Sequence, residues 1–143
     1  MSAAQHDLTL LRHAEPLAVV RLGPGADVPP WATTSTLFCV TATATETSLV
    51  CGVARVPRKA RSEGPYVAFS VAGTLDHALT GVLSGLLAPL AEAAVPVFTL
   101  STFETDWVLV PADRADVAER TWQEAGYAVR PVEASDLVPE EKK

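Results

Sequence analysis

The sequence contains little of what stabilises small secreted proteins. It has only two cysteines, Cys39 and Cys51, in 143 residues, and residues 1–11 lack the apolar run of a secretory signal. The two cysteines fall on the two arms of a predicted hairpin and could face each other there. Because no export signal accompanies them, we expect two free, buried thiols in a cytoplasmic protein.

A long hydrophobic run and a surplus of basic residues are also missing. The most apolar stretch, residues 82–100, is interrupted by Pro89, Glu92 and Pro96, so no segment approaches the roughly 18 apolar residues of a membrane span. The net charge of −6 disfavours nucleic acid, whose phosphates attract clustered lysine and arginine. The basic cluster at residues 55–61 is predicted to be a solvated connector rather than a binding patch. We therefore expect neither a membrane nor a nucleic acid as partner.

Motifs of enzymes and metal sites are absent too. The histidines His6, His13 and His77 show no His-x-x-x-His spacing, and no Cys-x-x-Cys, Gly-x-Ser-x-Gly or glycine-rich phosphate loop occurs. We expect no enzymatic activity, no catalytic residue, no metal and no cofactor. The only cluster that could support catalysis is Asp76 with His77 and Thr80. The simpler interpretation is that His77 is a histidine on a surface loop.

What the sequence does contain is an internal repeat. Residues 38–50 align without a gap with residues 98–110. In both copies an apolar run ends at a hydroxyl residue and is followed by a polar turn that contains Thr-Glu or Thr-Asp. A second apolar run, ending in Leu-Val, follows the turn. Residues 17–23 align with residues 67–73 in a weaker echo of the same kind. Such a repeat predicts one supersecondary unit used twice. The matching acidic turns also suggest a site where the two copies meet.

The second copy has the clearer pattern of elements. Apolar spacing and turn residues predict strands at residues 66–72, 95–100, 107–110 and 127–132, and helices at 81–94 and 113–125. The resulting β-α-β-β-α-β order is that of a ferredoxin-like unit, and the predicted fold class is α+β.

The first copy keeps the strands but has little helix. Strands are predicted at residues 17–22, 37–42 and 48–53, while the glycine- and proline-rich residues 23–30 are unsuited to a long helix. We therefore expect a first unit with a shortened helix at 8–60, a boundary within 58–63, a second unit at 64–133 and a charged tail at 138–143.

The second unit offers an anion site and a cation site. The first amides of the predicted helix have no internal partner and carry partial positive charge, so Thr80, Gly81 and Val82 suit a carboxylate. Asp106, with Ser101 and Thr102 at the end of the preceding strand, suits an ammonium group. These are the two demands of a zwitterionic amino acid. The candidate set is completed by Leu75 and Asp76, in the loop before the helix, and by Glu46, in the matching turn of the first copy.

Several of these residues also have a purely structural interpretation. Asp106 can cap the hairpin turn, and Asp76 can cap the helix. Trp107 and Trp122 are expected in the core or at an interface rather than stacked on a ligand. Trp31 follows two prolines in a loop, where it could cover a pocket or bind a partner.

Several segments of the sequence resemble an ACT domain. They are Gly73-Thr-Leu-Asp76, Leu79-Thr-Gly-Val82, Leu90-Ala-Glu-Ala-Ala94 and Leu100-Ser-Thr-Phe-Glu-Thr-Asp-Trp-Val-Leu-Val110. The resemblance extends over residues 8–133 and is strongest to the tandem subclass found in small bacterial proteins and in the cytosolic arginine sensors called CASTOR. It implies a regulatory protein whose units pair side by side and bind an amino acid at the seam. The shortened helix departs from the family pattern and weighs against a second, symmetry-related pocket.

Two hypotheses about function follow. The first is a small-molecule-binding regulatory protein that senses an amino acid. The second is a ligand-free structural or adaptor protein that binds a partner protein. Both predict a homodimer, because sheets of this kind leave edges that natural proteins usually cover.

Overall fold

The computed structural model describes residues 7–73, 75–76 and 79–139, and the chain divides into two compact units. One unit contains residues 15–67, and the other combines residues 7–14 with 68–139. Strands dominate both units and are joined by few helices, which confirms the predicted α+β class. Among the described residues, no helix has the length and apolar character needed to cross a membrane.

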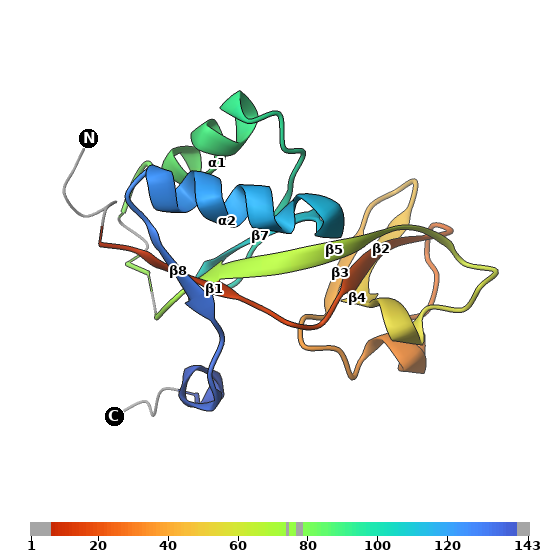
Figure 1. The fold of residues 1–143 in the computed structure, drawn as a ribbon. Coiled ribbons are helices and arrows are strands. Elements are labelled where there is room, and N and C mark those ends of the chain that lie inside the picture. The colour runs from red at the N-terminus through yellow and green to blue at the C-terminus, as the bar shows by residue number, and fades with distance from the viewer. Residues whose placement is uncertain (1–6, 74, 77–78, 140–143) are drawn as a thin grey trace. The chain divides into compact units, whose positions relative to one another are not determined.

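The unit of residues 7–14 and 68–139 has the predicted β-α-β-β-α-β order. Its elements are the end of β5 (Arg61–Val71), α1 (Val82–Glu92), β6 (Phe98–Ser101), β7 (Asp106–Pro111), α2 (Ala115–Glu124) and β8 (Ala128–Pro131). β6 pairs with β7, and β7 pairs with β5. The two helices pack against each other on one face of these strands (Figure 1).

A strand from far upstream joins this unit. β1 (Thr9–Arg12) pairs antiparallel with β5 and parallel with β8, so it lies between the first and last strands of the unit. The sequence analysis places this stretch in the first unit, at 8–60. It lies in the other unit because Leu10 is fully buried opposite Val71 and Val129, and because Arg12 forms ion pairs with Asp116 and Glu119 of α2 at 2.8 and 2.7 Å.

The unit of residues 15–67 is a sheet with almost no helix. β2 (Leu17–Leu22) pairs with β4 (Thr47–Gly52) on one side and with the beginning of β5 on the other, and β3 (Cys39–Ala42) pairs with β4. Single 3-10 turns at Pro30–Ala32 and Val53–Arg55 are the only helical segments described in this unit. The shortened helix is therefore confirmed.

The core of this unit includes a tryptophan and a cysteine. Trp31 packs against a buried cluster that contains Ala32 and Cys51, so it contributes to the core instead of to a loop surface. Cys39 pairs with Val50 across the hairpin. Because neighbouring residues of a strand point to opposite faces, Cys51 points away from Cys39, and both thiols are free. Burial raises the pKa of the Cys51 thiol, and the nearby Glu15 carboxylate adds to this effect.

Candidate functional site

The helix α1 begins after a glycine. Its N-cap is Gly81, which has a φ of 77° in the left-handed region that favours glycine. No side chain caps the helix, and its first turn contains no acidic residue. The backbone carbonyl of Asp76 accepts a hydrogen bond from the amide of Leu79 at 3.0 Å, and a cap by the Asp76 side chain stays a prediction. The first amides of α1 therefore keep the partial positive charge of a helix N-terminus.

The turn between β6 and β7 is held firmly in place. The Thr102 amide donates to the Thr105 carbonyl at 2.9 Å, which closes the turn. The Thr105 hydroxyl donates to the carbonyl of Val71, at the end of β5, at 2.8 Å. The Leu75 amide donates to the Glu104 carbonyl, also at 2.8 Å, and ties the loop before α1 to the same turn. Two loops that are far apart in the sequence thus meet at one place.

Asp106 is the first residue of β7 and is half-buried. One carboxylate oxygen, Oδ1, accepts a hydrogen bond from the Ser101 hydroxyl at 2.6 Å across the hairpin. The turn itself is closed by Thr102 and Thr105, so the structure does not show Asp106 as its cap. A carboxylate held by one neighbour has a second oxygen with which it can accept a hydrogen bond from a ligand.

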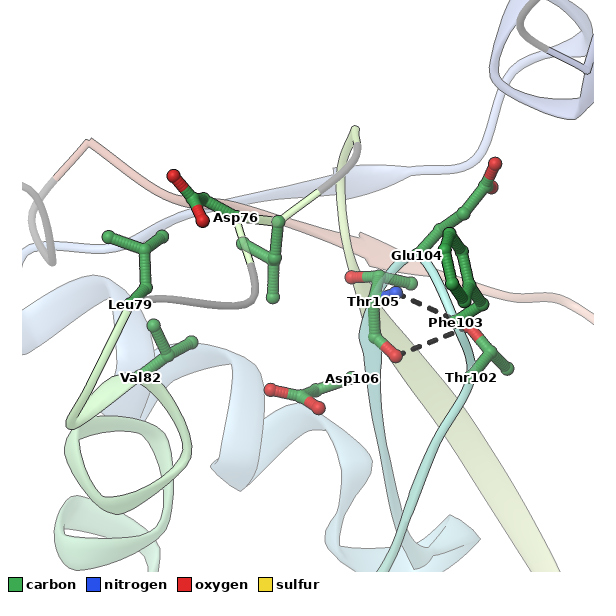
Figure 2. Close-up of a pocket in the computed structure, with 9 residues that line it drawn as sticks. Asp76, Leu79, Val82, Thr102, Phe103, Glu104, Thr105 and Asp106 are labelled. Atoms are coloured by element: carbon green, nitrogen blue, oxygen red, sulfur yellow. Dashed lines mark hydrogen bonds between the residues drawn. The ribbon is translucent and has the colours of Figure 1, made fainter. Parts of the chain in front are cut away.

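These loops and the start of α1 enclose a pocket of about 170 Å³ (Figure 2). It is lined by Leu75, Asp76, Leu79, Val82, Thr102, Phe103, Glu104, Thr105 and Asp106. Leu79 and Val82 come from the side of α1, whereas Asp106 and the Thr102–Thr105 turn come from the hairpin. All nine residues belong to the unit of residues 7–14 and 68–139.

The structure brings together five residues of the candidate set, namely Leu75, Asp76, Val82, Thr102 and Asp106. Ser101 does not line the pocket but holds the Asp106 carboxylate. Thr80 and Gly81 immediately precede Val82 and are exposed outside the lining. Four further lining residues were not predicted from the sequence, although they lie in the same two loops as the predicted ones: Leu79, Phe103, Glu104 and Thr105.

Glu46 lies apart from this pocket, in the unit of residues 15–67. It pairs with Arg21, with 3.8 Å between Oε2 and Nε. The backbone register explains why it does not match Asp106. The first hairpin turn is closed by Thr43 and Glu46, and the second by Thr102 and Thr105. Glu46 therefore corresponds to Thr105, one residue out of step with the gap-free alignment of the repeats.

A buried histidine contacts β7, the strand that begins with Asp106. His13 is 5% exposed, its Nε2 is 2.8 Å from the Ser70 hydroxyl, and its ring lies 4.5 Å from that of Trp107, the residue after Asp106. The other ring nitrogen, Nδ1, is buried and has no hydrogen-bond partner within the described part of the chain. Burial lowers the pKa of His13, and the carboxylate of Asp136 opposes this effect only in part. The neutral form of His13 is therefore favoured more strongly than in an ordinary exposed histidine.

This burial predicts a loss of stability in mild acid. As the pH falls below 6.5, the ordinary pKa of histidine, the unfolded chain takes up a proton that folded His13 resists. The free energy of unfolding should then fall by at most about 1.4 kcal/mol per pH unit, until the pH reaches the pKa of the folded state. Urea denaturation between pH 5 and pH 8 measures this slope, with the other two histidines, His6 and His77, replaced by glutamine.

The matched control is His13→Gln in the same background, because glutamine can still hydrogen-bond Ser70 but does not titrate. The slope below pH 6.5 should disappear in this variant. An equal slope with and without His13 would show that other groups cause it.

The unit that contains the pocket is similar to a known protein family. Residues 61–124 match the ACT domain. The pocket therefore lies in the part of the chain that matches the ACT domain model, where the sequence resemblance also places it. A second family model, which describes an N-terminal domain, matches residues 15–59. No curated protein matches the chain.

Solved structures show the same fold over most of the chain. A protein from Agobacterium tumefaciens has 24% identity and a TM-score of 0.82, over 88% of this chain and 94% of its own. A Vibrio cholerae protein of unknown function, described as a possible transport protein, has 13% identity and a TM-score of 0.72, over 85% and 92%. The regulatory subunit of aspartate kinase from Thermus flavus has 12% identity and a TM-score of 0.57, over 81% and 95%. At these identities the similarity establishes the fold alone.

Proposed function

We propose that this ACT-domain protein is a non-enzymatic, cytoplasmic regulator that binds a free amino acid in the pocket between α1 and the β6–β7 hairpin. One observation carries the proposal: the first residue of α1, Val82, and Asp106 line the same cavity. The helix amides suit the carboxylate of an amino acid, and Asp106 suits its ammonium group.

The charges around the pocket support a ligand that brings its own cation. Three of the lining residues, Asp76, Glu104 and Asp106, are acidic, and no lysine, arginine or histidine is among the described lining residues. A ligand with negative charge alone would meet this acidic rim with only the helix amides to offset it. The cavity of about 170 Å³ is also smaller than the roughly 300–1,000 Å³ of pockets for drug-sized molecules, which favours a compact ligand.

A titration of the full chain with each of the twenty amino acids tests this function. We expect heat from at least one of them in isothermal titration calorimetry, and Asp106→Asn should weaken that binding about tenfold or more, because a charge-assisted hydrogen bond is lost. The matched control is Asp113→Asn, an exposed aspartate in the 3-10 turn before α2 and outside the pocket, which should leave the affinity unchanged. The absence of heat with every amino acid at about millimolar concentration would contradict the proposal.

A ligand-free adaptor is the second candidate, and one observation favours it. Leu79 and Phe103, which both line the pocket, are 45% and 78% exposed. Large exposed apolar side chains around a hollow are typical of protein–protein contact sites. An adaptor would show no heat with amino acids. Under both candidate functions we expect a homodimer. In the described structure β3 and β6 each pair with a single strand, and natural proteins usually cover such sheet edges.

A further inference from the structure

A second cavity lies in the other unit and plays no part in the proposed function. It has a volume of about 230 Å³ and lies wholly within residues 15–67. Its lining comes from Ala18 of β2 and from residues 53–65, which form the 3-10 turn after β4, the following basic segment and the start of β5.

An irregularity in the sheet creates this hollow. Val19 of β2 pairs with Glu63, but Leu17 pairs with Tyr66, so β5 has one residue more than β2 over this interval. The extra residue forms a bulge at Gly64 and Pro65, opposite Ala18. A Cβ atom on Gly64 would lie 3.0 Å from the Leu17 carbonyl oxygen, which shows how closely the two backbones approach. Bulges of this kind occur frequently next to binding sites.

The lining has an apolar part and a charged rim. Val53, Val56 and Pro57 present apolar surface, while Arg58, Ser62 and Glu63 supply polar groups. Val56 also packs against the buried core of the unit, so this wall is fixed in place. A ligand that fits must therefore combine a hydrocarbon body with a polar end.

The charged residues of the lining are Arg58 and Glu63, and three further basic residues flank Arg58 in the sequence. Arg55, Arg58, Lys59 and Arg61 are exposed, and no ion pair joins any of them to a carboxylate within the described residues. Four cations within seven residues are unusual in a chain with a net charge of −6. An arginine at the edge of an apolar hollow can bind a carboxylate through two parallel hydrogen bonds.

We propose that this cavity binds a small aliphatic carboxylate, whose chain contacts Val53, Val56 and Pro57 and whose carboxylate pairs with Arg58. The apolar wall favours such a molecule over inorganic phosphate, which has no hydrocarbon to bury. The acidic charge of the chain as a whole weighs against a nucleic acid. This site is independent of the amino-acid pocket and lies in the other unit.

The experiment uses the full ¹⁵N-labelled chain and sodium hexanoate. We expect hexanoate to shift the amide resonances of Ala18 and residues 53–65 in a saturable manner, with a dissociation constant in the range of about 1–10 mM. Hexylamine and 1-hexanol carry the same chain without the negative charge, and both should bind about tenfold more weakly, because they cannot form the charge-assisted pair.

Two variants assign the binding to the cavity. Arg58→Glu should weaken hexanoate binding about tenfold or more, and Val53→Trp should remove it by filling the cavity from an exposed position. The matched control, Arg120→Glu, changes an exposed arginine on α2 in the other unit and should leave the affinity unchanged.

Several results would overturn the proposal. They are no shifts up to about 20 mM hexanoate, equal binding of hexanoate and 1-hexanol, shifts that map to residues 75–106 instead, or equal weakening by Arg58→Glu and Arg120→Glu. Inorganic phosphate that produces the same shifts at the same concentration would also overturn it, because the apolar wall would then contribute nothing.

Discussion

Replacing Trp122 with alanine should lower the free energy of unfolding by about 3–5 kcal/mol. Trp122 is the largest fully buried side chain among the described residues. Its ring meets Phe69 of β5 edge to face at 4.8 Å, and its indole Nε1 donates to the Leu86 carbonyl of α1 at 2.8 Å. One side chain of α2 thus holds both the sheet and the other helix. Urea denaturation followed by circular dichroism measures the loss.

Trp122→Phe serves as the matched variant. Phenylalanine keeps an aromatic ring against Phe69 but gives up the indole hydrogen bond and part of the buried volume, so we expect a smaller loss of about 1–3 kcal/mol. If Trp122→Ala cost less than about 1 kcal/mol, the helices would not depend on this contact. A large effect is also expected to weaken the amino-acid pocket, because α1 supplies one wall of it.

The elements of the fold could largely be predicted from local sequence patterns. Apolar residues at helical spacing predicted α1, and short apolar runs between turn residues predicted the strands, because these signals depend on burial of one face over a few neighbouring residues. β5 is an exception at its start. Its first residues, Arg61 to Pro65, are exposed and polar, so they suggested a boundary at 58–63 although they form part of one continuous strand ending at Val71.

Contacts between distant residues could not be predicted in this way. His13 meets Ser70 only because β1 lies beside β5, and no pattern within residues 9–12 indicates which unit will receive that strand. The pairing depends on long-range burial of Leu10, which any apolar strand of the same length could imitate. The same limit applies to the cavity at Gly64, which arises from a bulge rather than from a motif.

The candidate site was predicted in part, and the reason lies in the hairpin register. Asp106 and Val82, which were predicted from a strand end and a helix start, line the same cavity, and their role in binding a ligand stays a prediction. Glu46 was grouped with them through the repeat alignment. A shift of one residue moves a side chain to the opposite face of a strand, so similarity of sequence alone does not fix equivalent positions. The hydrogen bonds that close the two turns do fix them.

Replacing Gly64 with alanine should lower the free energy of unfolding by about 2–3 kcal/mol. Gly64 has a φ of +148°, which residues with a side chain rarely adopt. An added Cβ would also lie 3.0 Å from the Leu17 carbonyl oxygen and 3.3 Å from the Ala18 Cα, both of which are backbone atoms of the paired strand. Because backbone atoms cannot rotate away as a side chain can, the strands would have to separate. Urea denaturation measures the loss.

Alanine substitutions at two other glycines of the same unit distinguish the effect of the positive φ from the effect of the close backbone contact. Gly25 has a φ of +70° but has nothing within 4 Å of an added Cβ, so Gly25→Ala should cost only the conformational strain of about 1–2 kcal/mol. Gly23 has neither a positive φ nor a close neighbour, and Gly23→Ala should be neutral or stabilise the protein by up to about 1 kcal/mol. We therefore expect the losses to rise from Gly23 to Gly25 to Gly64. Equal losses for Gly25→Ala and Gly64→Ala would mean that β2 and β5 can move apart at the bulge without cost, and the cavity beside them would then have no rigid wall.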